Sequence, residues 1–231
     1  MDVLRLTKDQ FYKRLHSHIE KVYGKDESDE IVEDILNVFA DLQPAIDATD
    51  SEYAYKAWYE KDVYLITYGN SILSDSHAPL KALLQFLAKY LKGIVSTVHI
   101  LPFFPYSSDD GFAVIDYRQV NPELGEWSDI QSIAQQFDLM ADLVINHISS
   151  ESKWFQQFKN NKKPGCDYFI EANEADDLSK VVRPRASDLL QVVDTQQGKK
   201  KVWCTFSADQ VDLDFSNSDV LLEFIQILRF Y

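Results

Sequence analysis

The sequence predicts an α/β fold built on a parallel sheet or barrel. Three short apolar, β-branched runs have the length and composition of buried strands, at residues 63–68, 95–101 and 139–145. Apolar residues at helical spacing separate these runs, at residues 80–91 and 127–137. Each connection is long enough for the crossover that parallel strands require.

The first sixty residues predict a helical extension instead. Apolar residues recur every three or four positions over residues 11–22 and again over 31–42, as on one face of an amphipathic helix. Ser28 or Asp29 is expected to cap the second helix, and Pro44 follows its expected end.

The alternation fails between about residues 149 and 205. This stretch is irregular, yet it carries aromatic residues that a flexible linker would lack: Trp154, Phe155, Phe158, Tyr168 and Phe169. We interpret it as an excursion inserted after the third strand, and we expect its basic run, Lys199–Lys201, to be a solvated turn. A final helix is expected over residues 220–228, with caps in 216–218 and no partner for its apolar face.

Composition excludes several function classes. The 231 residues carry a formal net charge of −14, which does not provide the basic surface that nucleic acid requires. Cys166 and Cys204 form neither a CxxC pair nor a metal-ligand cluster, which favours a reducing compartment. No secretory signal and no apolar run of roughly 18 residues is present, so we expect a cytoplasmic protein without membrane contact.

Polar and aromatic residues gather where the three predicted strands end, at residues 68–70, at 102–112, and at Asn146 and His147. The carboxyl ends of parallel strands meet at one edge of a barrel. Aromatic faces there would cover a pyranose ring, and polar groups would bind its hydroxyls. Taken singly, Asp109–Gly111 predicts only a turn with a left-handed glycine.

Several motifs, in order, resemble the sucrose phosphorylase subfamily of glycoside hydrolase family 13. They are His99–Pro105, Asp109–Phe112 and the runs 114–117 and 124–127, followed by Asp142–His147, which resembles the family's first signature region. The resemblance implies the N-terminal part of a (β/α)8 TIM barrel, with about three β/α units. The implied parts are a helical extension, the first barrel units, a short inserted domain B and a return segment with a helix, at residues 1–60, 61–148, 149–206 and 207–231.

The resemblance also implies roles for individual residues. Asp109 would bind glucosyl hydroxyls, Phe112 would pack on the sugar ring, and His147 would hydrogen-bond the same unit. Asn146 matches a calcium-binding asparagine of related amylases, but phosphorylases of this subfamily generally do without calcium. We therefore expect no metal and no cofactor.

Acceptor-side residues follow from the same resemblance. Arg185 resembles an arginine that meets phosphate, and Phe206 and Gln210 would lie near the acceptor. Sucrose phosphorylases usually start near the first strand and carry a tyrosine where Val182 stands here. The long extension and the run Ser107–Asp110 favour the glucosylglycerate phosphorylase branch, so the expected small-molecule partners are a sugar substrate and inorganic phosphate.

The carboxyl groups that perform the chemistry are missing from the motif order. Retaining enzymes need two carboxyl groups about 5–5.5 Å apart. The resemblance puts the nucleophile in an Arg-Leu-Asp motif on the fourth strand, and no such motif occurs; Asp212 and Asp214 belong to the preceding segment.

We therefore expect a truncated α-glucoside phosphorylase that converts glucosylglycerate or sucrose plus phosphate to glucose 1-phosphate with retention. The chain alone is expected to be inactive and, with an open sheet edge, poorly folded. Two alternatives are a fragment of an amylase-like hydrolase and a non-catalytic sugar-binding protein. Arg185 disfavours the hydrolase.

Overall fold

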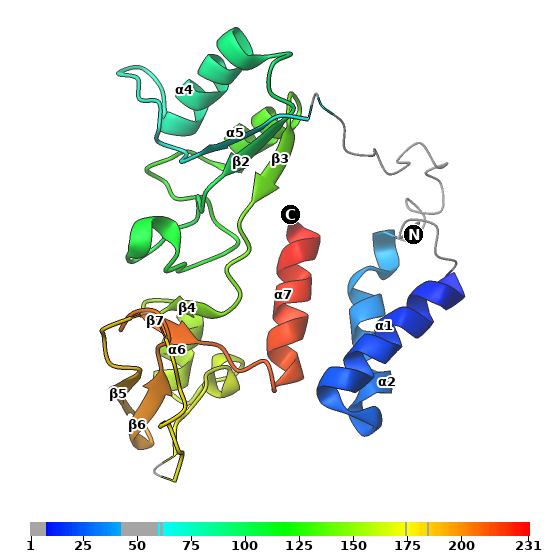
Figure 1. Cartoon of the computed structure of the whole chain (residues 1–231), viewed down its shortest axis with the longest axis vertical. Coiled ribbons are helices and arrows are strands. Elements are labelled where there is room, and N and C mark those ends of the chain that lie inside the picture. Colours follow the sequence, from blue (N-terminus) through cyan, green and yellow to red (C-terminus); the bar gives the residue numbers. More distant parts are fainter. Residues whose placement is uncertain (1–7, 43–59, 61, 174, 184) are drawn as a thin grey trace. The chain divides into compact units, whose positions relative to one another are not determined.

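The chain forms two compact units in a computed structural model (Figure 1). The larger unit is Tyr59–Asp214, and the smaller unit combines Met1–Trp58 with Phe215–Tyr231. The structure describes residues 8–42, 60, 62–173, 175–183 and 185–231. Within these residues, no helix is both long and apolar enough to cross a membrane.

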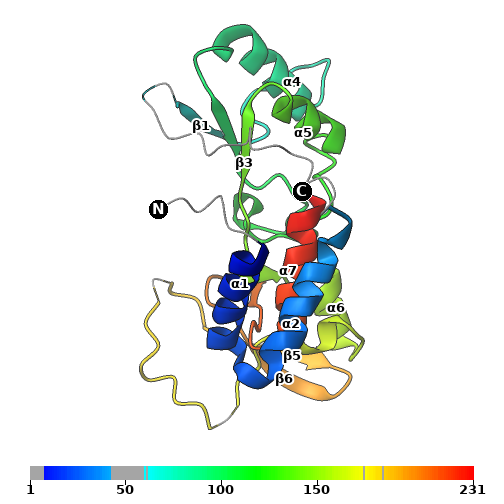
Figure 2. The ribbon, with the colours of Figure 1, turned by 90° about the vertical axis from the view of Figure 1, so that its right-hand side faces the viewer.

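A parallel sheet is the base of the larger unit, as the alternating pattern predicts. Its strands lie in the order β1-β2-β3: β1 (Tyr64–Thr67), β2 (Thr97–Ile100) and β3 (Asp138–Ala141). Both pairings are parallel, so Leu65 is opposite Val98, which in turn is opposite Leu139. Helices of the crossover connections are α4 (Pro79–Phe86), continued by η2 (Leu87–Leu91), and α5 (Trp127–Ala134) (Figure 2).

The third strand is shorter than the predicted range 139–145. It ends at Ala141, which lies opposite Ile100. Directly after β2, the backbone N–H of Leu101 still donates to Thr67 O of β1, at 2.9 Å. Pro102 has no N–H to continue the ladder. Residues 142–146 therefore lead out of the sheet toward the short strand β4 (His147–Ser149).

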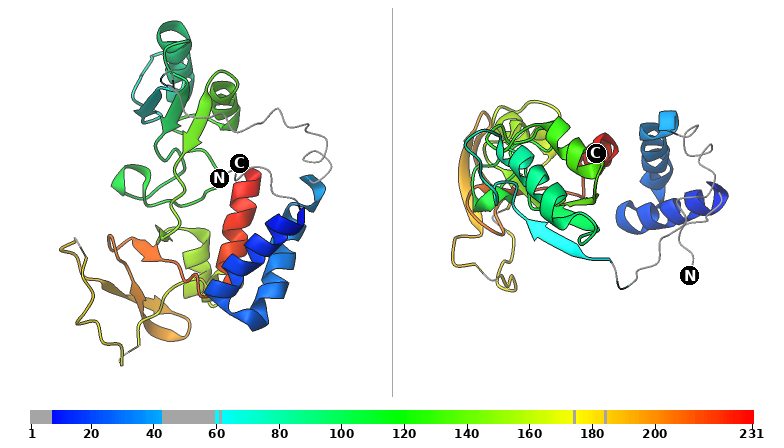
Figure 3. Two further views of the ribbon diagram at one scale, coloured as in Figure 1. Left: turned by 45° about the vertical axis from the view of Figure 1, so that its right-hand side comes forward. Right: turned by 90° about the horizontal axis from the view of Figure 1, so that it is seen from above.

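The predicted excursion contains regular elements that its composition did not indicate. They are α6 (Lys153–Lys159), η4 (Gly165–Asp167) and the hairpin of β5 (Leu190–Thr195) with β6 (Gly198–Trp203) (Figure 3). The aromatic residues do form a core, with Phe155, Phe158 and Phe169 at ring centroid distances of 5.1 to 5.6 Å.

The basic run Lys199–Lys201 lies in strand β6, so the predicted solvated turn is wrong. The side chain of Lys200 bonds Glu171 at 2.7 Å and lies over the Phe158 ring at 5.0 Å. These contacts hold one lysine against the aromatic core, and Lys199 pairs with Asp194 across the hairpin.

The smaller unit packs the C-terminal helix against the N-terminal ones. It contains α1 (Lys8–Tyr23), α2 (Lys25–Val38), η1 (Ala40–Leu42) and α7 (Ser218–Phe230). Ile19, Ile31, Val32 and Ile35 form a buried cluster, and the α7 residues packed against it are Leu221, Leu222 and Ile225. The apolar face of the last helix, expected to lack a partner, is thus covered within this unit.

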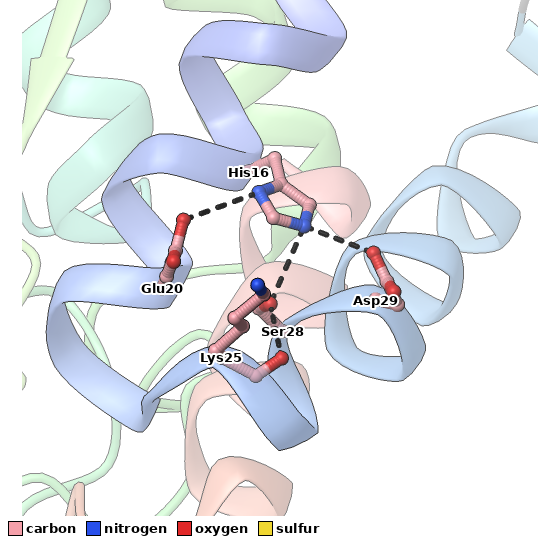
Figure 4. A network of polar contacts seen from close by, with 5 residues as sticks. All are labelled: His16, Glu20, Lys25, Ser28 and Asp29. Atoms are coloured by element: carbon pink, nitrogen blue, oxygen red, sulfur yellow. Dashed lines mark hydrogen bonds and ion pairs between the residues drawn. The ribbon is translucent and has the colours of Figure 1, made fainter.

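The second helix starts earlier than its predicted caps. It begins at Lys25 after Gly24, with no side-chain cap bond, so Ser28 and Asp29 lie inside the helix. Both residues instead face His16 of α1, whose Nε2 lies 3.3 Å from Ser28 Oγ and 2.9 Å from Asp29 Oδ1 (Figure 4). Their role is therefore to join α1 to α2.

The last helix is capped within the predicted range. The Asn217 side chain, at residue 217 of the expected 216–218, accepts a hydrogen bond from Asp219 N at 3.0 Å. Pro44, predicted to follow the end of the second helix, lies outside the described residues.

Candidate functional site

The loop after β2 holds Asp109 in an unusual backbone conformation. Asp109, Asp110 and Gly111 have φ of +58°, +50° and +108°, which confirms the predicted turn with a left-handed glycine. A Cβ on Gly111 would lie 2.8 Å from the carbonyl oxygen of Pro102, so only glycine fits. Non-glycine residues held at positive φ cost about 1–3 kcal/mol and cluster at functional sites.

Gln210 meets Asp109 from a strand far along the chain. It opens β7 (Gln210–Asp212), which pairs antiparallel with β4 and puts Gln210 opposite Ser149. The Gln210 side chain is 1% exposed, and its Nε2 donates to Asp109 Oδ2 at 3.0 Å. The structure thereby joins two of the predicted site residues directly.

His147 is a buried imidazole, and within the described part of the chain only one of its two nitrogens has a hydrogen-bond partner. Its Nε2 lies 2.9 Å from the carbonyl oxygen of Phe112, which can only accept, so Nε2 carries a proton. Nδ1 is buried and has no hydrogen-bond partner among the described residues. Burial lowers the pKa of His147 below its usual 6.5, although the Phe112 carbonyl and the nearby carboxylates of Asp212, Asp109 and Asp209 oppose the shift. The ring is therefore neutral at neutral pH, with Nδ1 as an unpaired acceptor.

Phe206 and Arg185 extend the site from His147. The rings of His147 and Phe206 lie 4.9 Å apart between centroids, and the Arg185 guanidinium carbon is 5.8 Å from the Phe206 centroid. Within about 6 Å a guanidinium is attracted to an aromatic face. Arg183, two residues earlier, donates from Nη1 to Thr205 O at 2.9 Å, next to Phe206 in the sequence. Arg185 itself is exposed.

Direct contacts join the six predicted site residues into two groups. Asp109 bonds Gln210, and the other four residues are joined by the pairs Phe112–His147, His147–Phe206 and Phe206–Arg185. The two groups are close enough for the Asp109 carboxylate to raise the pKa of His147 against the lowering effect of burial. The described contact of Phe112 with His147 uses its carbonyl and not its ring. The roles of these residues toward a sugar remain predictions.

Two carboxylates that the sequence did not predict as site residues lie beside these side chains. Asp209 accepts hydrogen bonds from the hydroxyls of Ser107, Ser108 and Ser207 at 2.6 to 2.8 Å. Burial opposes ionisation, but these hydroxyls outweigh it and lower the pKa of Asp209. No local pattern could reveal this, because two of the three serines lie about a hundred residues away.

Asp212 is the other such carboxylate and is only 4% exposed. It accepts from Thr205 N at 3.2 Å and from Asn146 Nδ2 at 3.3 Å. The asparagine that matches a calcium ligand in related amylases therefore donates to this carboxylate. In the described part of the chain, no group of three or more His, Cys, Asp or Glu residues is placed to hold a metal.

A cleft lies where the first two strands end. It has a volume of about 400 Å³, and Tyr68, Asn70, Tyr106 and Asp110 contribute to its walls. The first two predicted strand ends, 68–70 and 102–112, therefore meet at one edge of the sheet. Asp109 and Asp110, adjacent in sequence, contribute to different surroundings: one bonds Gln210, and the other lines the cleft.

A family profile and several curated proteins match this chain. The profile described as "Alpha amylase, catalytic domain" matches residues 80–231. The glucosylglycerate phosphorylase of Allomeiothermus silvanus is 51% identical over 174 residues, which cover 75% of this chain and 31% of that protein. The glucosylglycerate phosphorylase of Spirochaeta thermophila is 43% identical over 220 residues, covering 94% of this chain and 38% of that protein.

Solved structures agree at the level of the fold. The crystal structure of sucrose 6F-phosphate phosphorylase from Thermoanaerobacter thermosaccharolyticum superposes with a TM-score of 0.67 and 32% identity. The match covers 76% of this chain and 38% of that one. The chain spans about a third of the length of the curated relatives it matches.

Proposed function

The chain belongs to the alpha-amylase family of catalytic domains, glycoside hydrolase family 13, and from this we propose that it supplies donor-sugar and phosphate contacts of a retaining α-glucoside phosphorylase. The whole protein would convert glucosylglycerate and phosphate to glucose 1-phosphate, or sucrose in the same way. The glucosylglycerate branch is supported by the higher identity to the glucosylglycerate phosphorylases and by the long match that includes most of the helical extension.

The proposed donor site consists of Asp109, Phe112 and His147. Asp109 is an acceptor for sugar hydroxyls, and its bond to Gln210 uses only one position on its Oδ2. The neutral His147 ring has an acceptor nitrogen with no partner among the described residues. An uncharged, hydroxyl-rich ligand suits this set, since hydroxyls both donate to such acceptors and accept from amides such as Gln210.

The proposed phosphate contact is supported by the position of Arg185, whose guanidinium lies over the ring of Phe206, next to His147. A guanidinium is always charged, and its fork matches phosphate oxygens. On a chain of net charge −14, a cation beside the sugar site is what an anionic co-substrate requires. A hydrolase, whose acceptor is water, has no such need.

The two catalytic carboxyl groups are proposed to come from parts of the whole protein other than residues 1–231. Asp212 is buried and engaged by Thr205 and Asn146, which fits a structural role. In this proposal β1, β2 and β3 are the first strands of an eight-stranded barrel, and residues 149–206 are its inserted domain B. The isolated chain would bind ligands without turning them over.

Phosphorolysis by the whole protein that contains this chain tests the proposal. Glucose 1-phosphate should form from glucosylglycerate faster than from sucrose, and only when phosphate is present. Release of free glucose independent of phosphate would establish the amylase-like hydrolase instead. Sugar binding without any turnover would establish a non-catalytic binding protein.

Arg185→Ala should raise the KM for phosphate in that assay by roughly tenfold or more, since a lost charge-assisted hydrogen bond costs about 1.5–3 kcal/mol. Lys199→Ala is the matched control, because it also removes one exposed charge, but on the β5–β6 hairpin. An unchanged phosphate KM in Arg185→Ala would contradict the assignment.

A further inference from the structure

Asp209 is hydrogen-bonded to two consecutive serines of the loop that contains Asp109. Its Oδ2 accepts from Ser107 Oγ at 2.8 Å and from Ser108 Oγ at 2.6 Å. Its backbone oxygen accepts from Ser150 N at 2.7 Å, which ties Asp209 to the residues just after β4. The side chain of Asp209 thus holds the two loop residues that precede Asp109, while its backbone is tied to Ser150 after β4.

The hydroxyl protons allow these bonds to exist together. Each serine hydroxyl has a single proton, and Ser107 and Ser108 each direct theirs to Asp209. Ser149 Oγ, fully buried and 2.7 Å from Ser107 Oγ, then donates to Ser107. Ser149 itself accepts from Glu151 N at 3.0 Å. The result is a directed chain of hydrogen bonds that ends on Asp209.

The backbone that follows these two serines is the strained part of the loop. Asp109 and Asp110 have positive φ directly after Ser108. Such conformations persist only where surrounding contacts over-determine them. Gln210, the neighbour of Asp209, holds the Asp109 side chain, while Asp209 holds the two residues that precede it.

We propose that Asp209 is a positioning residue, which through Ser107 and Ser108 keeps the Asp109 carboxylate oriented toward the donor sugar. The inference rests on the proposed function, because it assumes that Asp109 binds the glucosyl unit. Asp209 itself has no assigned contact with substrate. Its influence on the orientation of the sugar-binding carboxylate passes through Ser107 and Ser108.

A double-mutant cycle on the 231-residue chain tests this claim. Glucose is titrated while the His147 ring signals are followed by NMR, because His147 belongs to the same site. We expect Asp209→Ala to weaken glucose binding about fivefold, and Asp209→Asn, which keeps an acceptor oxygen for the serines, to recover most of the affinity. In an Asp109→Asn background, Asp209→Ala should have no further effect.

The control and the alternative variants keep the outcomes distinct. Asp194→Ala, which removes an exposed carboxylate on the hairpin, should leave glucose binding unchanged. If circular dichroism shows that Asp209→Ala does not fold, the pair Ser107→Ala with Ser108→Ala removes the same bonds and should give the same loss.

Two results overturn the inference alone. One is unaltered glucose affinity in Asp209→Ala, and the other is an equal loss in the presence and absence of Asp109→Asn, which would indicate a general structural role. Failure of the unsubstituted chain to bind glucose, while circular dichroism shows it folded, would instead overturn the proposed donor site, and the inference with it.

Discussion

His147 shows how one buried side chain acquires its chemical state. Burial disfavours the charged ring, and the Phe112 carbonyl decides which nitrogen carries the proton. Nδ1 is left as a buried acceptor without a partner among the described residues. Such an atom costs about 1–3 kcal/mol when it stays unpaired. A ligand hydroxyl would remove that cost, which is why we place the sugar here.

The lowered pKa of His147 predicts a pH dependence of stability. The folded value lies below the usual 6.5, so the unfolded chain binds the proton more readily. The free energy of unfolding should therefore fall as pH drops below about 6.5 and show no such contribution above it. His147→Gln should flatten this slope in denaturant titrations between pH 5 and 8. His18→Gln, at an exposed position of α1, should not; equal slopes in all three proteins would refute the effect.

Two glycines with nearly equal φ separate backbone strain from steric clash. Gly111 and Gly198 have φ of +108° and +107°, but only at Gly111 would a Cβ meet another atom, the Pro102 carbonyl oxygen at 2.8 Å. We expect Gly111→Ala to lower the free energy of unfolding by more than Gly198→Ala, which suffers only the strain of about 1–3 kcal/mol. Denaturant unfolding measures both, and equal losses would contradict the described loop geometry.

At the level of elements, α7 is a C-terminal helix whose apolar residues pack on the N-terminal helices. Its residues Leu221, Leu222 and Ile225 pack on the cluster of α1 and α2. Arg229 on α7 also pairs with Asp41 of η1. The helical extension therefore has a structural task of its own, since it covers the apolar face of the last helix.

A pair of neighbouring residues on α2 tests this packing. Ile35 is 5% exposed in the cluster, whereas Leu36 is 36% exposed. Ile35→Ala should lower the free energy of unfolding by about 2–5 kcal/mol. Leu36→Ala should change it by only about 0.5 kcal/mol. Thermal unfolding followed by helical circular dichroism compares them, and similar losses would show that the cluster does not stabilise the unit.

Elements with strong local patterns could be predicted from the sequence. The strands β1 and β2 follow from short apolar, β-branched runs, and the helices α1, α2, α4 and α7 follow from apolar periodicity. The β5–β6 hairpin could not, because Lys199–Lys201 has no apolar alternation and gains its order from its partner strand and Glu171. The early end of β3 could not be predicted from residues 139–145, because we attribute it to Pro102, which follows β2 and has no N–H to donate.

The candidate site divides in the same way. Asp109 and His147 stand in recognisable motifs at strand ends, so sequence alone could nominate them. Asp209 has no local signal, because its partners Ser107 and Ser108 are about a hundred residues away and only the β4–β7 pairing brings them together.

At the level of the whole molecule, the chain matches only part of the proteins that resemble it. It spans about a third of its curated relatives, and its larger unit combines a parallel sheet with the residues proposed to bind sugar and phosphate. No Arg-Leu-Asp motif occurs in its 231 residues. Binding and turnover should therefore be separable in this chain, because retaining chemistry needs a carboxylate nucleophile and binding does not.

One NMR sample tests that separation most directly. The 231-residue chain is mixed with glucosylglycerate and phosphate, saturation transfer reports contact with the glucosyl protons, and the phosphorus spectrum reports glucose 1-phosphate. We predict saturation transfer to the glucosyl protons, weakened in Asp109→Asn, together with no glucose 1-phosphate. Absence of saturation transfer, or formation of glucose 1-phosphate by this chain alone, would contradict the account.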